Sequence, residues 1–382
     1  MEKVKLTDIC DFQGGSQPPK EEWSFDEQEG YIRMLQIRDF TQGERVTPEY
    51  IKISNTTKMC EANDILIARY GASIGKILTG LAGAYNVAIM RTIPDTSRIK
   101  KLYLYYYLKS PYFQNAILNV GSRATQAGFN KEDLSKLDIE CPELIKQDKI
   151  IAVLEKLECI IEKRKIELSN LDDLIKARFV EMFGDPIQNP KGWEVVTIGD
   201  IVTEVRYGTS KPAVEGGKYP YLRMNNLTAD GHLDLNDLKY IDIPDDEIEK
   251  CVVRKGDVLF NRTNSIELVG KTAVFDLPED MIIAGYIIRV RLTEKMLPEV
   301  LSQYMNLEAL KGILRGMAKG AVNQANINAQ ELQSIKVYIP EMELQKQFVK
   351  MKEQIYKSKV AVQKALDETQ ILFDSLMQKY FG

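Results

Sequence analysis

The stretch FNKEDLSKLDIECPELIKQDKI, residues 129–150, returns without gaps as INAQELQSIKVYIPEMELQKQF, residues 327–348. The same register continues to MFG, which ends at Gly184, and to YFG, which ends at Gly382, so the offset is 198 residues throughout. Paired positions include Asn130 with Asn328, Leu134 with Leu332, Pro142 with Pro340 and Gln147 with Gln345. A repeat of this length decides the architecture. We therefore predict a tandem duplication of one unit, a mixed domain followed by a long helix.

Looser matches extend upstream and need gaps. DFQGGSQPP resembles VRYGTSKPA, YIRMLQIRDF resembles YPYLRMNNLT, and RATQAGFN resembles AVNQANIN. The runs DILIARY, YNVAIMRTI, DVLFNR and YIIRVRL are apolar, rich in β-branched residues and bounded by Gly, Asn and Pro, which predicts strands and turns. Helical periodicity appears over 102–118 and 299–314. Each mixed domain is predicted to be α+β with a curved, largely antiparallel sheet.

Each copy ends in a long segment without a helix breaker, from Pro142 to Gly184 and from Pro340 to Gly382. Forty residues of helix would span ~60 Å, more than one domain needs. Alternating steps of four and three give a heptad seam at Ile150, Leu154, Leu157, Ile161, Arg164, Leu168, Leu171, Ile175, Arg178 and Met182. The second copy gives Phe348, Lys352, Ile355, Lys359, Val362, Leu366, Thr369, Phe373, Leu376 and Tyr380.

A single stripe of this kind would be interpreted as a helix face turned to its own core. Two such helices in one chain favour packing against each other as an antiparallel coiled coil, with the mixed domains at opposite ends and related by a pseudo-two-fold axis. The segment FGDPIQNPKGW marks the linker between copies. The predicted boundaries are 1–142 for the first mixed domain, 143–184 for the first helix, 185–192 for the linker, 193–340 for the second mixed domain and 341–382 for the second helix.

Composition narrows the classes of function. One histidine, His232, leaves no room for a two-histidine metal site, and it stands in a run typical of a loop. Five cysteines lie far apart without a CxxC pair, which fits reduced thiols. No apolar run has the length of a signal peptide or a membrane span, so we expect a cytoplasmic protein without a membrane partner.

The charge distribution is uneven. The net charge is −4, which argues mildly against a free-standing nucleic-acid binder. Between residues 62 and 131, however, the only acids are Asp64 and Asp95, against nine Lys and Arg. An acidic run over 234–249 is interpreted as a solvated face that repels DNA.

Motifs for the sharper chemistries are missing. GASIGK, residues 71–76, has three residues between its glycines and Ile after its Lys, so it fits a turn near DNA phosphates or a structural hairpin better than a nucleotide-binding loop. The only Pro-Pro pair is followed by Lys20, not by the aromatic residue of an adenine-methyltransferase tetrapeptide. No E-x-K tripeptide of carboxylate-plus-lysine nucleases occurs. We predict neither a catalytic residue nor a metal site.

These features together resemble the specificity subunit of type I restriction-modification enzymes. The resemblance covers essentially the whole chain. It rests on the P-x4-Q helix openings, the linker FGDPIQNPKGW, the segments QAGFN and QANIN, and the strand-turn segment NDILIARYGASIGK with its diverged copy GDVLFNRTNSIELVGK. The order and duplication of these motifs are specific, although no single one is decisive.

The resemblance implies two target-recognition domains that each read one half of a bipartite, asymmetric site in double-stranded DNA. It implies that the helices act as a ruler and dock two methyltransferase subunits, to which restriction subunits can add. S-adenosylmethionine, ATP and Mg²⁺ are then expected on those partners only. Half-sites read from one side of the duplex lie about one turn, ~34 Å, apart, which a rod of this length can span.

Long polar side chains on loops and strand ends are the candidates for DNA binding, because Arg, Asn and Gln can pair with base edges and Lys attracts phosphates. In the first domain these are Arg38, Arg69, Tyr70, Ser73, Lys76, Arg123 and Gln126. In the second they are Lys211, Arg223, Asn225, Asn226, Arg262, Asn264, Arg315, Lys319 and Gln324. Gln126 and Gln324 hold matching positions, which favours a shared structural or backbone-contact role.

The alternative function is a coiled-coil adaptor whose two mixed domains bind protein or sugar. The basic span of the first domain speaks against it, and the net acidity speaks for it. Salt dependence of DNA binding would separate the two hypotheses.

Overall fold

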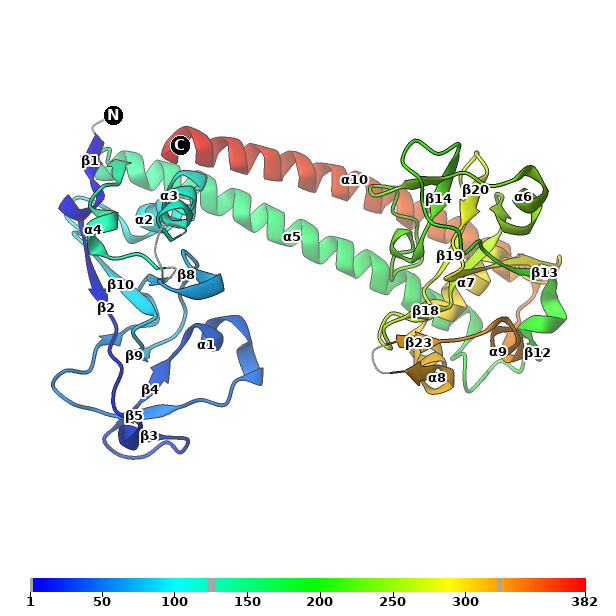
Figure 1. Ribbon diagram of the computed structural model, residues 1–382, viewed down its shortest axis with the longest axis horizontal. Helices are drawn as coiled ribbons and strands as arrows, with labels where there is room; N and C mark the ends of the chain where they lie inside the picture. Colours follow the sequence, from blue (N-terminus) through cyan, green and yellow to red (C-terminus); the bar gives the residue numbers. More distant parts are fainter. Residues whose placement is uncertain (1–2, 122–127, 322–323) are drawn as a thin grey trace. The chain divides into compact units, whose positions relative to one another are not determined.

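The computed structural model describes residues 3–121, 128–321 and 324–382. The chain divides into unit 1, which is Met1–Arg164 with Lys364–Gly382, and unit 2, which is Lys165–Gln363. Each unit contains several small sheets, short helices, and parts of two long helices (Figure 1).

The described strands of unit 1 form three sheets. One pairs β1 (Lys3–Lys5) with β11 (Asp138–Glu140). The second has the order β2 (Cys10–Gly14), β10 (Ile89–Pro94), β7 (Leu66–Ala68), β8 (Ile77–Leu78). The third has the order β3 (Trp23–Ser24), β5 (Tyr50–Lys52), β4 (Tyr31–Leu35), β9 (Gly83–Tyr85), β6 (Met59–Cys60). The helices are α1 (Ile37–Thr41), α2 (Lys101–Lys109), α3 (Pro111–Gly121) and α4 (Lys131–Leu134).

Unit 2 repeats this order among its described strands. Its sheets are β12 (Glu194–Thr197) with β24 (Lys336–Ile339); β13 (Val202–Tyr207), β21 (Ile287–Leu292), β17 (Val258–Asn261), β19 (Thr272–Val274); and β15 (Lys239–Ile241), β14 (Tyr219–Leu222), β20 (Met281–Ile283), β16 (Val252–Val253). A further sheet, β18 (Thr263–Asn264), β23 (Gln324–Asn326), β22 (Lys319–Ala321), belongs to unit 2. The helices are α6 (Asp245–Cys251), α7 (Pro298–Asn306), α8 (Glu308–Met317) and α9 (Ala329–Ser334).

The two units therefore share one topology, and the predicted α+β fold with an internal repeat is confirmed. The strand pairs are antiparallel except β4 with β9 and its counterpart β14 with β20, which are parallel. The expectation of one curved sheet per domain is wrong, because the strands are divided among smaller sheets. β7 and β17 are buried along their whole length, which explains why DILIA and DVLF read as continuous apolar runs.

Each stretch of helical periodicity contains two helices instead of one. Ser110, between α2 and α3, is extended with ψ 149°, the conformation that a following proline imposes. Leu307, between α7 and α8, adopts the same conformation without a proline after it. A sequence pattern of one face cannot reveal such a break, because the apolar face continues across it.

The long helices are α5 (Leu144–Phe183) and α10 (Met342–Phe381), 40 residues each. They pack antiparallel in each unit: Ile150 and Leu154 share a core with Phe381 in unit 1, and Phe179 lies 5.3 Å from Phe348 in unit 2. The seam positions of α10 are all buried or half-buried. Near the end of α5 the heptad register is wrong.

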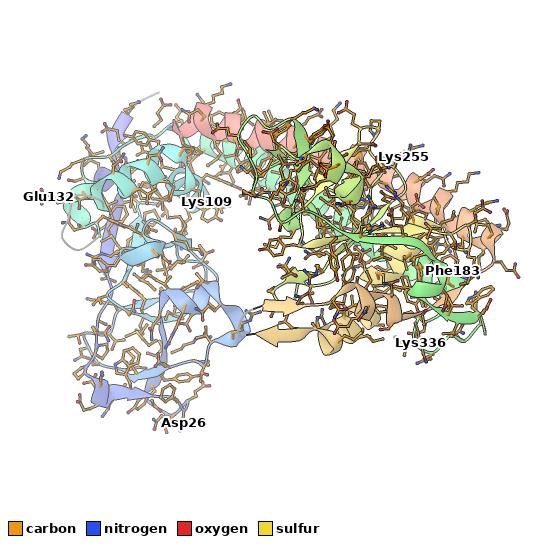
Figure 2. All side chains as sticks on the ribbon, turned by 45° about the vertical axis from the view of Figure 1, so that its right-hand side comes forward. Asp26, Lys109, Glu132, Phe183, Lys255 and Lys336 are labelled. Carbon is orange, nitrogen blue, oxygen red and sulfur yellow. The ribbon has the colours of Figure 1, made fainter. Side chains whose placement is uncertain are left out.

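The exposed Arg178 and half-buried Met182 give way there to the fully buried Phe179 and Phe183. A straight helix has 3.6 residues per turn, so its buried face drifts away from a strict 3.5-residue repeat. The backbone carbonyl of Phe183, a residue labelled in Figure 2, accepts a 2.8 Å hydrogen bond from Nε1 of Trp193, just before β12. Gly184 follows with φ +90°, the left-handed conformation in which glycine commonly ends a helix.

The glutamine of the P-x4-Q helix openings clamps each long helix to the loop before α2 or α7. Gln147 Oε1 accepts from Lys100 N at 2.8 Å, while its Nε2 donates to Arg98 O and Pro142 O at 2.8 and 2.7 Å. Gln345 makes the same three contacts in unit 2, with Leu297 N, Lys295 O and Pro340 O. Both side chains are fully buried. The repeated motif is therefore a structural clamp.

The paired asparagines also have a structural role. The side chain of Asn130 accepts from Asp133 N at 3.1 Å and caps α4, and that of Asn328 accepts from Glu331 N at 2.9 Å and caps α9. In both helices the acidic third residue bonds back to the cap, which forms a capping box.

Most of the cysteines are packed inside the fold, and the single histidine packs against an aromatic ring. Cys10, Cys60 and Cys251 are buried, and burial raises the pKa of Cys10 to about 12 and that of Cys60 to about 11. His232 stands in a loop and stacks on Tyr356 with 4.8 Å between ring centroids. Within the described residues, no group of three or more His, Cys, Asp or Glu could hold a metal ion. None of the helices searched there is long and apolar enough to cross a membrane.

Candidate nucleic-acid interface

A hollow of about 510 Å³ opens in unit 2 beside the ends of β13, β14 and β17. It gathers predicted residues that are distant in sequence, namely Lys211, Arg223, Asn225 and Arg262. Tyr221 and Tyr286 also line it. The sheet fixes the backbone up to the end of each strand. The residues that follow make no sheet hydrogen bonds, so their side chains can point into the hollow.

The side chain of Asn226 closes the turn after β14, which carries Arg223 and Asn225. Arg223 N donates to Asn226 Oδ1 at 2.8 Å, and Asn226 Nδ2 donates to Asp234 O at 2.8 Å. Asn226 is 2% exposed, so its amide is used by the turn and is not placed to read a base. Asn225, its exposed neighbour, keeps that possibility.

Arg262 lies between β17 and β18 with its guanidinium 4.9 Å above the ring of Tyr207. One of its terminal nitrogens donates to Gly285 O at 3.5 Å, and its buried Nε has no partner among the described residues. Stacking on the ring holds the planar donor group in one orientation. An arginine fixed in this way can present two donors to one guanine edge.

Two acids form ion pairs with basic residues of this hollow. Asp237 Oδ2 accepts from Arg223 at 2.7 Å, and Glu247 pairs with Lys211 at 2.9 Å. The hydrogen bonds from Lys239 and Arg223 hold the pKa of Asp237 below its ordinary value. The acidic run is therefore not a bare solvated face, since these two members neutralise candidate DNA contacts.

A second hollow, of similar volume at about 510 Å³, occupies the corresponding place in unit 1. Arg38 lines it together with Gln17, Lys20, Trp23, Gln36 and Glu49. Glu49 accepts hydrogen bonds from both Arg38 and Gln36. The turn is the one seen in unit 2, because Gln36 N donates to Asp39 Oδ2 at 2.9 Å.

A close backbone approach shows that the two hollows share one frame. Gly15 follows β2 and Gly208 follows β13. A Cβ on Gly15 would lie 2.1 Å from Asn86 O, and one on Gly208 would lie 2.1 Å from Ile283 O. Only glycine fits at either position. Residues after these glycines are thereby brought against the ends of β9 and β20.

Arg69 and Tyr70 follow β7 and lie together in unit 1. The guanidinium of Arg69 is 5.0 Å above the ring of Tyr70, and its Nε donates to Phe129 O at 3.3 Å. Tyr70 also forms a β-bridge with Gly128, where a Cβ would lie 2.3 Å from its ring. Gly14 leaves room for Arg69, because a Cβ on Gly14 would lie only 2.9 Å from Arg69 Nη1.

GASIGK forms a hairpin between β7 and β8, which is one of the two alternatives that the sequence left open. Gly75 adopts φ +80° and its N donates to Ala68 O at 2.9 Å. Ser73 is half-buried in the turn and Lys76 is exposed beside it. Lys76 is therefore free to reach a phosphate, whereas the turn itself is a strand connection.

The remaining predicted residues lie outside the two hollows. Asn264 Nδ2 donates to Asn261 Oδ1 at 2.8 Å, and Arg315 pairs with Glu308 at 2.6 Å on α8. Lys319 and Gln324 belong to the backbone of β22 and β23. Arg123 and Gln126 lie outside the described residues.

Much of the basic span of unit 1 is paired with carboxylates. Asp64 pairs with Arg91 at 2.8 Å and with Lys101 at 3.2 Å. Further pairs are Lys100 with Asp148, Lys109 with Glu158 and Lys131 with Asp11. Within the described ranges, Arg69 and Lys76 have no carboxylate partner. An excess of basic residues along the sequence therefore overstates the free positive charge.

Sequence reasoning missed several residues that line the hollows. Gln36 and Arg223 hold the same place, directly after β4 and β14, so aligning LQIRDF with LRMNN residue by residue would have found Gln36. Trp23 and Tyr221 gave no such signal, because aromatic residues in strands are ordinarily core residues. Tyr286 lies in the turn before β21 and is 50% exposed.

The comparisons with known proteins bear on this arrangement. The family model described as "Type I restriction modification DNA specificity domain" matches residues 1–170 and 190–369. The type I restriction enzyme EcoKI specificity subunit of Escherichia coli (strain K12) is 23% identical over 299 residues, which are 73% of this chain and 64% of that protein. The type I restriction enzyme MjaVIII specificity subunit of Methanocaldococcus jannaschii is 22% identical over 363 residues, 90% of this chain and 83% of that protein.

Among solved structures, a chain from a study of complex assembly and conformational transition of the type I R-M system has a TM-score of 0.64 at 19% identity. The match covers 100% of this chain and 97% of that one. The S subunit of a type I restriction-modification system from M. genitalium has a TM-score of 0.56 at 16% identity. At these identities the likeness establishes the fold.

Proposed function

This chain belongs to the type I restriction modification DNA specificity family, and from that premise we propose that it selects the DNA sequence on which a type I restriction-modification complex acts. Each unit reads one half of a bipartite site in double-stranded DNA. The observation that carries the proposal is the pair of equivalent hollows lined by different polar side chains.

The half-sites are expected to differ. Unit 1 offers Gln36 and Arg38 where unit 2 offers Arg223 and Asn225. Glutamine and asparagine favour adenine, whereas arginine favours guanine, so exchanging their order changes the base pattern that is read. A palindromic site is excluded by this proposal.

The chemistry is assigned to partner subunits. Two methyltransferase subunits dock on the helices α5 and α10, which also set the spacing between half-sites, and restriction subunits can add to this complex. S-adenosylmethionine, ATP and Mg²⁺ belong to those partners, because the chain carries no nucleotide-binding loop, methyltransferase tetrapeptide or E-x-K tripeptide. The chain itself is a non-catalytic subunit of a cytoplasmic complex.

Exchange of one domain tests the proposal. Residues 1–142 are replaced by the corresponding domain of a relative, and methylated motifs are mapped in cells that carry the hybrid with its methyltransferase. One half-site should change while the other stays. The matched control replaces residues 193–340 and should change the opposite half. Methyl transfer by the isolated chain, or loss of both half-sites from either exchange with the complex still assembled, would contradict the proposal.

The salt dependence of binding separates this function from an adaptor. Affinity of the assembled complex for its DNA should fall steeply with salt, since cations that neutralise phosphates release counterions. Affinity that does not respond to salt would favour the adaptor.

A further inference from the structure

A separate cavity of about 300 Å³ lies within unit 2, between parts of α5, α7, α8 and α10 and the loops before β15 and β19. Its volume is at the lower end of the range for small-molecule pockets, about 300–1,000 Å³. The lysines Lys271, Lys311 and Lys352 line it from a loop, α8 and α10. This cavity takes no part in the proposed reading of DNA.

The three lysines lack carboxylate partners within the described residues. Lys271 Nζ donates to Met224 O at 2.9 Å and to Leu227 O, and Lys311 Nζ donates to Gly270 O. Lys352 makes no hydrogen bond or ion pair with the described part of the chain. Lys271 and Lys311 are each 9% exposed. Buried ammonium groups ordinarily require a counter-charge.

Three of the four acids that line the cavity form ion pairs with other cations. Lys359 bonds to both Asp172 and Asp230, and Arg315 pairs with Glu308 at 2.6 Å. Burial lowers the pKa of all three lysines, and that of Lys311 falls to about 8. Glu308 favours the charged form of Lys311, and Asp230 and Glu299 favour that of Lys352, but only through space. None of the three lysines forms an ion pair in the described part of the chain, so their positive charge is compensated only in part.

The repeat retains one of these lysines in unit 1 and replaces the other two, since Lys76 stands where the aligned Gly-Lys pair places Lys271. Leu154, fully buried, stands where the 198-residue register places Lys352. Gln114 Nε2 donates to Gly75 O at 2.9 Å in the way that Lys311 donates to Gly270 O, so a neutral residue makes the same contact. The charges of Lys311 and Lys352 are therefore particular to unit 2.

We propose that this cavity binds a small phosphate-bearing molecule, whose phosphate oxygens accept from Lys271, Lys311 and Lys352. Three ammonium groups from separate elements can surround one multivalent anion, and the anion then supplies counter-charge to all three. Gln303 and Asn306 in the same wall add neutral polar groups. The ligand is a free small molecule, because a cavity of about 300 Å³ has room for a small phosphate compound and not for a duplex.

Binding is measured by calorimetry on the full-length chain in phosphate-free buffer, with inorganic phosphate, pyrophosphate and ATP as probes. Lys352→Leu and Lys311→Gln replace each lysine by a residue that the repeat supplies at or near its counterpart. Lys350→Leu, which removes an exposed lysine from the same helix, is the matched control. Saturable binding of at least one probe, weakened by about tenfold or more in both cavity variants and unchanged in the control, is the expected result.

A second measurement needs no variant. Acylation of lysines in the wild-type chain, followed by mass spectrometry, should show Lys311 and Lys352 protected by pyrophosphate while Lys350 stays reactive. The proposal is overturned if every probe binds more weakly than about 1 mM or leaves Lys311 and Lys352 unprotected. It is also overturned if the cavity variants lower only the salt dependence of DNA binding, because the phosphate would then come from the DNA backbone.

Discussion

The hollows of unit 1 and unit 2 have the same backbone and different side chains. In both, the backbone at Gly15 or Gly208 passes so close to a carbonyl oxygen that only glycine fits. In both, a turn closed by a side-chain hydrogen bond follows β4 or β14. On this frame unit 1 presents Gln36 and Arg38, whereas unit 2 presents Arg223 and Asn225. The difference teaches that the frame and the reading surface are set by separate residues, so one can change without the other.

A second difference lies behind the hollows. Unit 1 has the fully buried Leu154 where the repeat places Lys352 in unit 2, and Lys352 lines a cavity. The duplicated unit therefore tolerates exchange of apolar core for charge at this place. Such an exchange costs stability unless something compensates the charge.

The largest expected effect tests whether the frame is shared. Gln147→Leu and Gln345→Leu each remove a buried side-chain amide and leave one backbone NH and two backbone carbonyl groups without that hydrogen-bond partner. Each unsatisfied buried group costs about 1–3 kcal/mol, so each variant should lose more than about 3 kcal/mol of unfolding free energy. Urea denaturation measures the loss, and Gln188→Leu in the exposed linker is the control. Unequal losses would show that only one copy needs its clamp.

Lys311 gives the next largest effect, and it depends on pH. Its pKa is lowered from 10.5 to about 8 by burial and by Arg315 and Lys271, against the opposing effect of Glu308. Below pH 8 both folded and unfolded chains carry the proton, so the folded state bears the full penalty, about 3 kcal/mol. From pH 8 to 10.5 the folded chain loses the proton first, and stability rises by that amount.

Lys311→Gln should remove this rise, since Gln114 shows that glutamine can make the equivalent contact in unit 1. The variant should be more stable than the wild type below pH 8, and the gap should shrink toward pH 10.5. Denaturation is compared across this range in phosphate-free buffer. An unchanged gap at all values of pH would contradict the assignment.

A change of specificity tests the reading surface. Arg223→Gln gives unit 2 the residue that unit 1 carries after β4, without altering the NH that closes the turn. Loss of one good contact to a base costs about 1–3 kcal/mol, so one position of one half-site should relax by about ten- to a hundredfold. Methylation mapping reads both halves at once. Gln36→Arg is the reciprocal variant, and a change in the same half-site from both would refute the assignment of one half-site to each unit.

The sequence predicted the architecture well because the repeat and the long helices leave strong patterns. Asn130 and Gln147 recur at a fixed offset because each satisfies backbone groups that both copies must satisfy. The seam of α5 was right from Ile150 to Ile175 and wrong after it, where drift of the helix brings Phe179 inward. A fixed period cannot follow such drift over a whole helix.

The candidate interface was predictable only in part. Lys211, Arg223, Asn225 and Arg262 are distant in sequence yet line one hollow, as residues at strand ends can. Asn226 differs from Asn225 in that its amide is consumed by a turn, which depends on backbone geometry. The free charge was also hidden, because Asp64 neutralises Arg91 and Lys101 across gaps in sequence that composition does not show.

The smallest expected effect concerns the acids that hold these cations in the free chain. DNA must displace Asp237 from Arg223 and Glu49 from Arg38 before either arginine can bind a base. Surface pairs are worth about 0.2–1 kcal/mol, so Asp237→Asn and Glu49→Gln should each strengthen binding by a few-fold. Glu49 is the less exposed acid, 19% against 66% for Asp237, and its variant should gain more. Fluorescence anisotropy of the assembled complex at several salt concentrations measures the gain, with Asp242→Asn as control. A loss of affinity with altered base preference would instead mean that the carboxylate itself reads a base, since it can accept from cytosine N4.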